Sequence, residues 1–160
     1  MSTCRRARER DLPALVQLIN RAYEIEAFFV TGDRTDLGEV GELYAAGDFF
    51  VLDGAPEAPL VGCVYVAARP DARAYLGLLS VQPDAQKAGV GRALVEVAET
   101  HARGLGARFM ELRVVDAREE LPRWYEKLGY RMTGEQEDVP PEKVNRFTRP
   151  IRFLCMEKTL

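Results

Sequence analysis

Two glycines at the expected start of a helix are the residues whose types and spacing point most directly to chemistry. Gly89 and Gly91 have no Cβ, so a ligand can approach the backbone closely at this point. The first amides of a helix have no partners within the helix and lie at the positive end of its dipole, which favours a phosphate or pyrophosphate. Lys87 and Arg92 place cations beside them. Glycine-rich turns between a strand and a helix also occur in many proteins that bind nothing there, so the pattern alone leaves both interpretations open.

A strand before these glycines and a helix after them must position the turn. The apolar run 76–81 predicts a buried strand, which Pro83 and Asp84 end, and a helix is expected from about Gly89 to Gly104 or Gly106. Apolar residues at helical spacing predict the buried face of this helix: Val90, Ala93, Leu94, Val97, Ala98 and His101. The opposite, exposed face is expected to carry Glu96, Glu99 and Arg103.

Two well-known phosphate-binding loops do not fit this stretch. The chain contains no Gly-x4-Gly-Lys-Ser/Thr sequence, which excludes a P-loop. The dinucleotide-binding fingerprint requires a third glycine where Leu94 stands, and its loop is shorter. Neither of these two loops therefore describes the stretch.

Length and composition predict a single domain, 1–160, that has a core of its own. The chain has 160 residues, 47% of them hydrophobic and 29% charged, which is ordinary for a globular protein. The net charge of −3 gives no general reason to bind nucleic acid or anionic membranes. No apolar run approaches the roughly 20 residues of a membrane helix, and the basic N-terminus lacks the apolar centre of a signal peptide.

The cysteines and the histidine indicate a reducing compartment and no metal site. Three cysteines without metal-binding spacing predict free thiols in a cytoplasmic protein, with Cys63 and Cys155 in apolar runs that favour core positions. The single histidine leaves too few ligands for a zinc site. A monomer or a homodimer is compatible with these features.

The order of the expected elements predicts an α+β fold with αβα layers. A mixed, mostly antiparallel central sheet of about seven strands is expected with about four helices. The expected strands are 4–8, 49–52, 60–68, 74–81, 109–115, a strand from 130 onward, and 147–159; the expected helices are 12–23, 37–44, 89–104 and 121–128.

Gln86, Gly89 and Gly91 resemble motif A, Gln/Arg-x-x-Gly-x-Gly/Ala, of the GNAT superfamily of N-acetyltransferases. The element order resembles that family over essentially the whole chain. In the family, amides of this loop hold the pyrophosphate of acetyl-CoA, and the strand ahead binds the pantetheine arm through its backbone. The resemblance therefore implies acetyl-CoA as co-substrate, contacted by Leu79, Ser80, Val81, Gln86, Lys87, Ala88, Gly89, Val90, Gly91 and Arg92.

The segment Trp124–Tyr130 resembles a second family motif, aromatic-Tyr-x-Lys-Leu-Gly-Phe/Tyr. In relatives, the tyrosine at the position of Tyr125 points at the CoA sulfur and acts as general acid. A phenol of pKa near 10 suits that position, because it donates a hydrogen bond to a departing thiolate. The alternative is a core aromatic residue, as is expected of Trp124 and Tyr130.

Two arginines depart from the family pattern. Relatives often have an asparagine that contacts the cofactor where this chain has Arg118, and we keep Arg118 as a cofactor-binding candidate. Relatives that acetylate protein N-termini often carry a glutamate used as base where this chain has Arg113. Arg113 counts against that subclass and is a substrate-binding candidate, although it could instead simply pair with Glu111 on the same strand face.

An amine acceptor needs a base, because an amine of pKa about 10.4 is unprotonated only about once in 2,500 molecules at pH 7. Glu26, beside the apolar run 27–30, is the first candidate and Asp33 the second; a solvated loop carboxylate is the alternative for each. Phe29 and Asp33 are substrate-binding candidates, because the acceptor is expected between the segment 24–47 and the polar loop 136–145.

Acidic residues in the segment 24–47 suggest a cationic acceptor, because an acidic rim concentrates cations. The rim would comprise Glu24, Glu26, Asp33, Asp36, Glu39 and Glu42, with Glu137 and Asp138 opposite. The alternative is that these residues only solvate exposed helices.

The sequence as a whole predicts an acetyl-CoA-dependent N-acetyltransferase acting on a primary amine of a small molecule or peptide. The alternative is a non-catalytic acyl-CoA-binding or regulatory module of the same fold. Tyr125 favours the enzyme, because a module that only binds has no need of a phenol at the sulfur.

Overall fold

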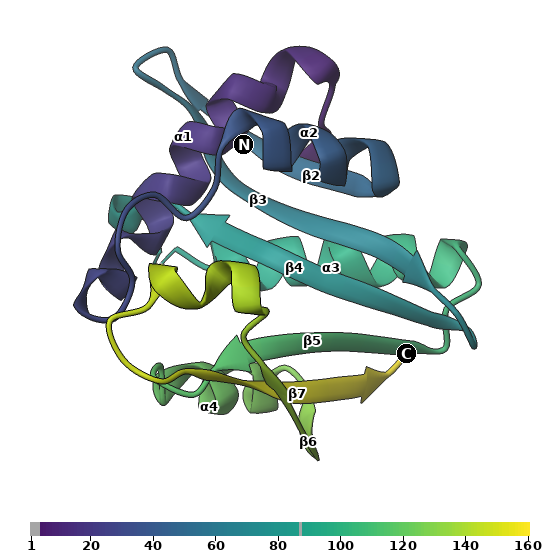
Figure 1. The fold of residues 1–160 in the computed structure, drawn as a ribbon. Helices are drawn as coiled ribbons and strands as arrows, with labels where there is room; N and C mark the ends of the chain where they lie inside the picture. Colours follow the sequence, from purple (N-terminus) through teal and green to yellow (C-terminus); the bar gives the residue numbers. More distant parts are fainter. Residues whose placement is uncertain (1–3, 87) are drawn as a thin grey trace.

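The computed structural model describes residues 4–86 and 88–160, which form a seven-stranded sheet with helices on both faces (Figure 1). The strand order is β1-β2-β3-β4-β5-β7-β6. The strands are β1 (Cys4–Arg6), β2 (Asp48–Ala55), β3 (Ala58–Arg69), β4 (Arg73–Val81), β5 (Phe109–Val115), β6 (Arg131–Asp138) and β7 (Arg152–Thr159). The α-helices are α1 (Leu12–Ala22), α2 (Leu37–Ala46), α3 (Val90–Gly104) and α4 (Glu120–Lys127). The short 3-10 helices between these elements are η1 (Glu9–Asp11), η2 (Tyr23–Phe28), η3 (Pro83–Ala85) and η4 (Pro141–Arg146).

The expected α+β fold and mixed sheet are confirmed. Neighbouring strands are antiparallel except β4 and β5, which are parallel and joined by the crossover through α3. The last strand begins at Arg152, later than expected, because the preceding residues include η4 and the isolated bridge from Val30 to Phe147.

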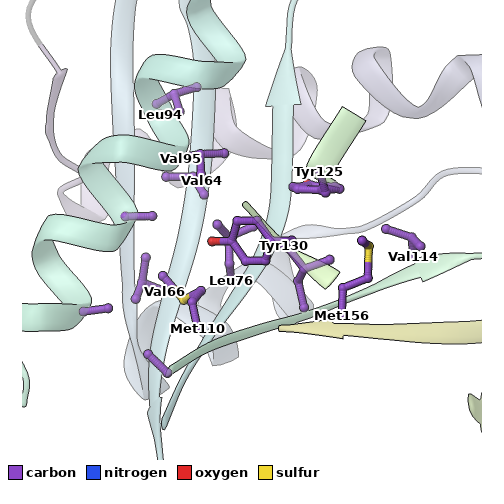
Figure 2. Packing of buried hydrophobic residues seen from close by; sticks show 14 of the residues in the cluster. Val64, Val66, Leu76, Leu94, Val95, Met110, Val114, Tyr125, Tyr130 and Met156 are labelled. Atoms are coloured by element: carbon purple, nitrogen blue, oxygen red, sulfur yellow. The ribbon is translucent and has the colours of Figure 1, made fainter. Parts of the chain in front are cut away.

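Two apolar clusters, one on each face of the sheet, give the fold its layers. Helices α3 and α4 pack on one face through Leu94, Val95, Ala98 and Tyr125. Figure 2 shows three of these residues, Leu94, Val95 and Tyr125, in the same cluster as Tyr130 and Met156. Helices α1 and α2 pack on the other face. Each helix carries apolar residues at helical spacing on the side that packs against the sheet, and the burial of these residues holds the helix in place.

The predicted buried and exposed faces of α3 were wrong at two positions. Glu99 is buried, and Ala93 is exposed. The carboxylate of Glu99 accepts a hydrogen bond from the Tyr130 hydroxyl at 2.9 Å and two from the Lys158 ammonium at 3.0 and 3.1 Å. Both partners come from distant strands or their ends, so the spacing of residues within α3 could not indicate that this charge would be satisfied inside.

We expect Glu99→Ala to lower the free energy of unfolding by about 1–3 kcal/mol, because it leaves the Tyr130 hydroxyl and the half-buried Lys158 ammonium without their acceptor. Urea unfolding measures this change. Glu96→Ala is the matched control on the same helix: the side chain of Glu96 is 67% exposed and, among the described residues, pairs only with Arg92, so a shift of at most about 0.5 kcal/mol is expected. Equal losses in both variants would contradict the assigned role of Glu99.

The seam between β4 and β5 is short. The two strands pair only where Arg73, Ala74 and Tyr75 face residues 109–111. Further along β4, the register against β3 shifts between the pairs Cys63–Ser80 and Tyr65–Gly77, and Leu78 has a φ of 48°. Such a bulge bends the strand that contains it. The far ends of β4 and β5 are therefore not paired with one another.

Candidate active site

A cavity of about 860 Å³ lies where β4 and β5 separate. One wall is the β4 segment 75–81 and the other the β5 segment 112–115, with further residues from α3, α4, η2 and η4. This volume falls in the usual range for small-molecule sites, which is roughly 300–1,000 Å³. The cavity therefore sits at the one parallel pairing of the described sheet.

Gly89 and Gly91 form the turn that begins α3 at one end of this cavity. Gly89 is the N-cap with a φ of 77°, a conformation that favours glycine, and a Cβ there would meet nothing within 4 Å. A Cβ at Gly91 would lie 3.3 Å from the Trp124 ring, so this helix start packs tightly against α4. The Gln86 side chain donates a hydrogen bond to the Val81 carbonyl at 3.4 Å, which ties the turn to the end of β4.

Most of the cofactor-binding candidates line the cavity: Leu79, Ser80, Val81, Gln86, Gly89, Gly91, Arg92 and Arg118. Ala88 and Val90 do not line it. The Val90 side chain points toward β3, where its Cγ1 atom lies 3.1 Å from the position that a Cβ would take at Gly62. Lys87 lies outside the residues that the structure describes.

Tyr125 of α4 lines the cavity and is 7% exposed. Its ring packs edge-on against Trp124 and Tyr130, with centroid distances of 4.9 and 5.7 Å. Burial, reinforced by Tyr23 and Tyr75, raises the pKa of Tyr125 above its usual range. Its hydroxyl makes no hydrogen bond with the described residues, so a protonated donor without a partner is held in the cavity wall.

Glu26 and Arg118, which are distant in sequence, meet in the same cavity. The Arg118 Nη1 atom donates to the Glu26 carboxylate at 3.3 Å. Burial raises the pKa of Glu26 despite the attraction of Arg118, and the residue is 5% exposed. Within residues 4–86 and 88–160, the Arg118 Nε is the buried side-chain nitrogen that lacks a hydrogen-bond partner, although the Glu120 carboxylate lies 3.5 Å away.

Of the three substrate-binding candidates, the structure brings only Arg113 to the cavity. Its guanidinium lies 5.0 Å from the Phe153 ring centroid and pairs with Glu137, not with Glu111. Phe29 is fully buried and stacked on Phe147, so it packs behind the cavity wall instead of facing a ligand. Asp33 also lies outside the lining, and its carbonyl oxygen accepts a hydrogen bond from Arg146.

The expected acidic rim is not assembled in this structure. Of its six members in the segment 24–47, only Glu26 lines the cavity. Cations dominate the lining instead: Arg34, Arg92, Arg113, Arg118, Arg123, Lys127, Lys143 and Arg146, against Glu26 and Glu120. Glu39 pairs with Arg34. The four other members are exposed and lie outside the lining, which agrees with the alternative that they solvate exposed helices: Glu24, Asp33, Asp36 and Glu42.

Three further aromatic residues, which were not among the predicted site residues, also line the cavity: Tyr23, Tyr75 and Trp124. Burial raises the pKa of Tyr23 to about 12. Tyr75 lies over Gly77, where a Cβ would come within 2.7 Å of its ring, so the absence of a side chain at Gly77 makes room for the phenol. The sequence could have indicated this arrangement through the glycine two residues after Tyr75, because positions two apart lie on the same face of a strand.

Metal-ligand clusters and membrane-spanning helices are both absent from the part of the chain that the structure describes. Within the described ranges, no group of three or more His, Cys, Asp or Glu side chains could hold a metal ion. None of the helices in those ranges is long and apolar enough to cross a bilayer.

Solved structures match this fold closely. The ribosomal-protein-S18-alanine N-acetyltransferase from Escherichia coli superposes with a TM-score of 0.77 at 19% identity, covering 99% of this chain and 94% of that one. A ribosomal-protein-alanine N-acetyltransferase from Brucella melitensis gives 0.74 at 22% identity, covering 99% of both chains. At these identities the likeness concerns the fold alone.

Curated relatives are similar in sequence over part of their length. A mycothiol acetyltransferase from Actinosynnema mirum is 29% identical over 124 residues, which are 76% of this chain and 41% of that protein. A mycothiol acetyltransferase from Propionibacterium freudenreichii is 35% identical over 78 residues, 49% of this chain and 24% of that protein. This chain thus spans less than half the length of these relatives. The family model "Acetyltransferase (GNAT) family" matches residues 12–130, most of the chain, so this protein belongs to the GNAT acetyltransferase family.

Proposed function

We propose that this chain is an acetyl-CoA-dependent N-acetyltransferase that transfers the acetyl group directly to a primary amine of a small molecule or peptide. The observation that carries the proposal is the Tyr125 hydroxyl, which has no partner among the described residues and sits in the wall of the cavity between β4 and β5. The membership in the GNAT family and the glycine turn at the start of α3 support the same activity.

The residues present fit acetyl-CoA. The edge of β4 beyond Tyr75 is not paired with β5 and can accept an extended pantetheine arm through its backbone. The start of α3 offers amides to a pyrophosphate, while Arg92, Arg123 and Lys127 line the same cavity.

Bound acetyl-CoA supplies an activated acetyl thioester. The Tyr125 hydroxyl, whose pKa is raised by burial, holds its proton and donates a hydrogen bond where a thiolate leaves. We assign the role of base to the Glu26 carboxylate, whose pKa is also raised by burial and which would take the proton of the amine directly or through water. Arg118 holds Glu26 in position through the 3.3 Å contact.

The test is a panel of primary amines, scored by thiol release from acetyl-CoA and by mass spectrometry of the acetylated amine. Calorimetry with acetyl-CoA runs in parallel. Acetylation of any amine with turnover supports the proposal. Tight binding of acetyl-CoA without acetylation of any amine would instead favour the non-catalytic acyl-CoA-binding module.

We expect Glu26→Gln to lower kcat/KM for the amine about 100-fold at pH 7, because the amide cannot accept a proton. The carboxylate is the basic form above its raised pKa, so the wild-type rate should fall with acidification at a higher pH than for an exposed glutamate. Wild type and variant should converge below that pKa. Glu24→Gln, on an exposed neighbour outside the cavity lining, is the control. Parallel pH profiles for wild type and Glu26→Gln would exclude Glu26 as the base.

The free thiols also support a cytoplasmic location as part of this proposal. Cys4, Cys63 and Cys155 form no disulfide, which is typical of proteins from reducing compartments.

A further inference from the structure

Helix η4 places two cations on one side, facing the cavity. A 3-10 helix has three residues per turn, so Lys143 and Arg146 project from the same side of it. Both side chains line the cavity together with Arg34 from the segment before α2. We call Arg34, Lys143 and Arg146 the cationic cluster. The sequence suggested only a polar loop here, and no part of the mechanism above uses these three residues.

Arg146 is held rigidly, yet its charge is not neutralised. Its Nη2 atom donates to the carbonyl oxygens of Asp33 and Arg34 at 2.9 and 2.7 Å. These acceptors carry no net charge, and within the described ranges no carboxylate forms an ion pair with Arg146. The remaining Nη1 and Nε groups keep their donor capacity. A fixed guanidinium with free donors and an uncompensated charge is suited to bind an oxyanion.

The other two members of the cationic cluster share a single carboxylate. Glu39 lies 3.5 Å from Arg34 and 3.9 Å from Lys143, and it also accepts a hydrogen bond from the Thr35 hydroxyl at 2.9 Å. Glu39 itself does not line the cavity. Three cations are thus balanced by one carboxylate, which leaves a net positive charge on the cavity wall.

The phosphates of acetyl-CoA do not account for this charge. They would lie at the start of α3, which covers the opposite face of the sheet from η4 (Figure 1). Arg92, Arg123 and Lys127 are the cations of the cavity on helices α3 and α4. The cationic cluster instead lies beside η2, because the backbone of Thr31 donates to the Arg146 carbonyl at 2.6 Å and Val30 bridges Phe147. Glu26, the proposed base, belongs to η2.

We propose that the acceptor amine carries a carboxylate and that Arg146 and Lys143 bind it. This inference rests on the proposed acetyl transfer, and it gives the acceptor a chemical class: amino carboxylates. A carboxylate bound by the cationic cluster fixes the acceptor at one end, which leaves its amine to reach the space between Glu26 and Tyr125. A polyamine or another polycation is disfavoured by the same charges.

The test compares amino carboxylates with their own amides. Amino acids with one to five carbons between the two groups are assayed for kcat/KM beside the matching amino amides, and the spacer length that works best reports the distance between the two subsites. We expect the wild type to prefer the acid over the amide at least about tenfold. Arg146→Gln should reduce that preference at least about tenfold and Lys143→Gln about threefold or more.

Arg149→Gln is the matched control, because its guanidinium packs 5.2 Å from the Phe28 ring and does not line the cavity. It should leave the acid-to-amide preference unchanged. Lys143→Gln removes a cation without breaking the hydrogen bonds from Arg146 to the carbonyl oxygens of Asp33 and Arg34. This variant therefore tests the carboxylate site even if Arg146→Gln does not fold.

Equal use of acids and amides by the wild type, or an unchanged preference in both variants, overturns this inference while leaving acetyl transfer intact. If no amine is acetylated, the proposed function fails first. Calorimetry of the same acids and amides against protein saturated with coenzyme A then still tests whether the cationic cluster binds a carboxylate. A preference for acids that Arg146→Gln and Lys143→Gln reduce supports the inference, and equal affinities exclude it.

Discussion

Tyr125→Phe should lower kcat by about 10²–10⁴-fold while the protein stays as stable as the wild type. The hydroxyl makes no hydrogen bond within the described residues, so its removal leaves no group without a partner. The ring keeps its edge-on contacts with Trp124 and Tyr130. The loss concerns only the donor at the departing sulfur, so the KM for acetyl-CoA should change little. Single-turnover kinetics isolate this step from product release.

Tyr130→Phe provides the opposite pattern as a control. Its hydroxyl donates to the buried Glu99 at 2.9 Å, so the substitution should lower the free energy of unfolding by about 1–2 kcal/mol and leave kcat near the wild-type value. The comparison of these two variants would thus distinguish a loss of catalysis from a loss of stability. Near-normal single-turnover rates in a folded Tyr125→Phe protein would remove Tyr125 from the mechanism.

Gly91→Glu should weaken acetyl-CoA binding by at least about 100-fold. A side chain at this position starts 3.3 Å from the Trp124 ring and must extend toward the cavity, which places a carboxylate where the pyrophosphate would lie. Two negative charges then compete for the same helix amides. Calorimetry with coenzyme A measures the loss without requiring turnover.

Gly104→Glu is the matched control at the other end of α3, where a Cβ meets nothing within 4 Å. It adds the same charge to the same helix far from the turn, so the affinity for coenzyme A should stay within about twofold of the wild type, because exposed charges are screened over about 10 Å. Unchanged affinity in a folded Gly91→Glu protein would exclude the turn at Gly89 as the pyrophosphate site.

The sequence predicted the elements well wherever local pattern decides. Helix α3 begins at the glycine turn and ends at Gly104 as expected, because glycines and an apolar period act over a few residues. The parallel strand after α3 follows from the length of the crossover. The family motifs likewise placed Tyr125 and most of the cofactor-binding candidates in one cavity, since each motif is a short contiguous segment.

What the sequence could not supply depends on partners far along the chain. Glu99 was expected in solvent because Tyr130 and Lys158, its partners, lie 31 and 59 positions away. Phe29 was expected to face a substrate, but Phe147 covers it. Arg146 reaches the carbonyl of Asp33 across 113 positions, and no periodic pattern indicates such a contact. These are tertiary contacts, which local propensity does not encode.

The short seam between β4 and β5 has a consequence for cooperativity. Three residue pairs join these two strands, whereas β5 and β7 are paired along seven positions and β3 and β4 also along seven. The seam is thus as short as the pairing of β1 with β2, but it lies in the middle of the sheet and not at its edge. Amides of β5, β7 and β6 should therefore exchange with solvent deuterium through an opening that leaves β2–β4 protected. A ligand lying along the free edge of β4 would act as an added strand and suppress this opening. Hydrogen exchange should then slow in β5 as well, although the ligand lies along β4, because the opening between the two strands is what exposes the amides of β5.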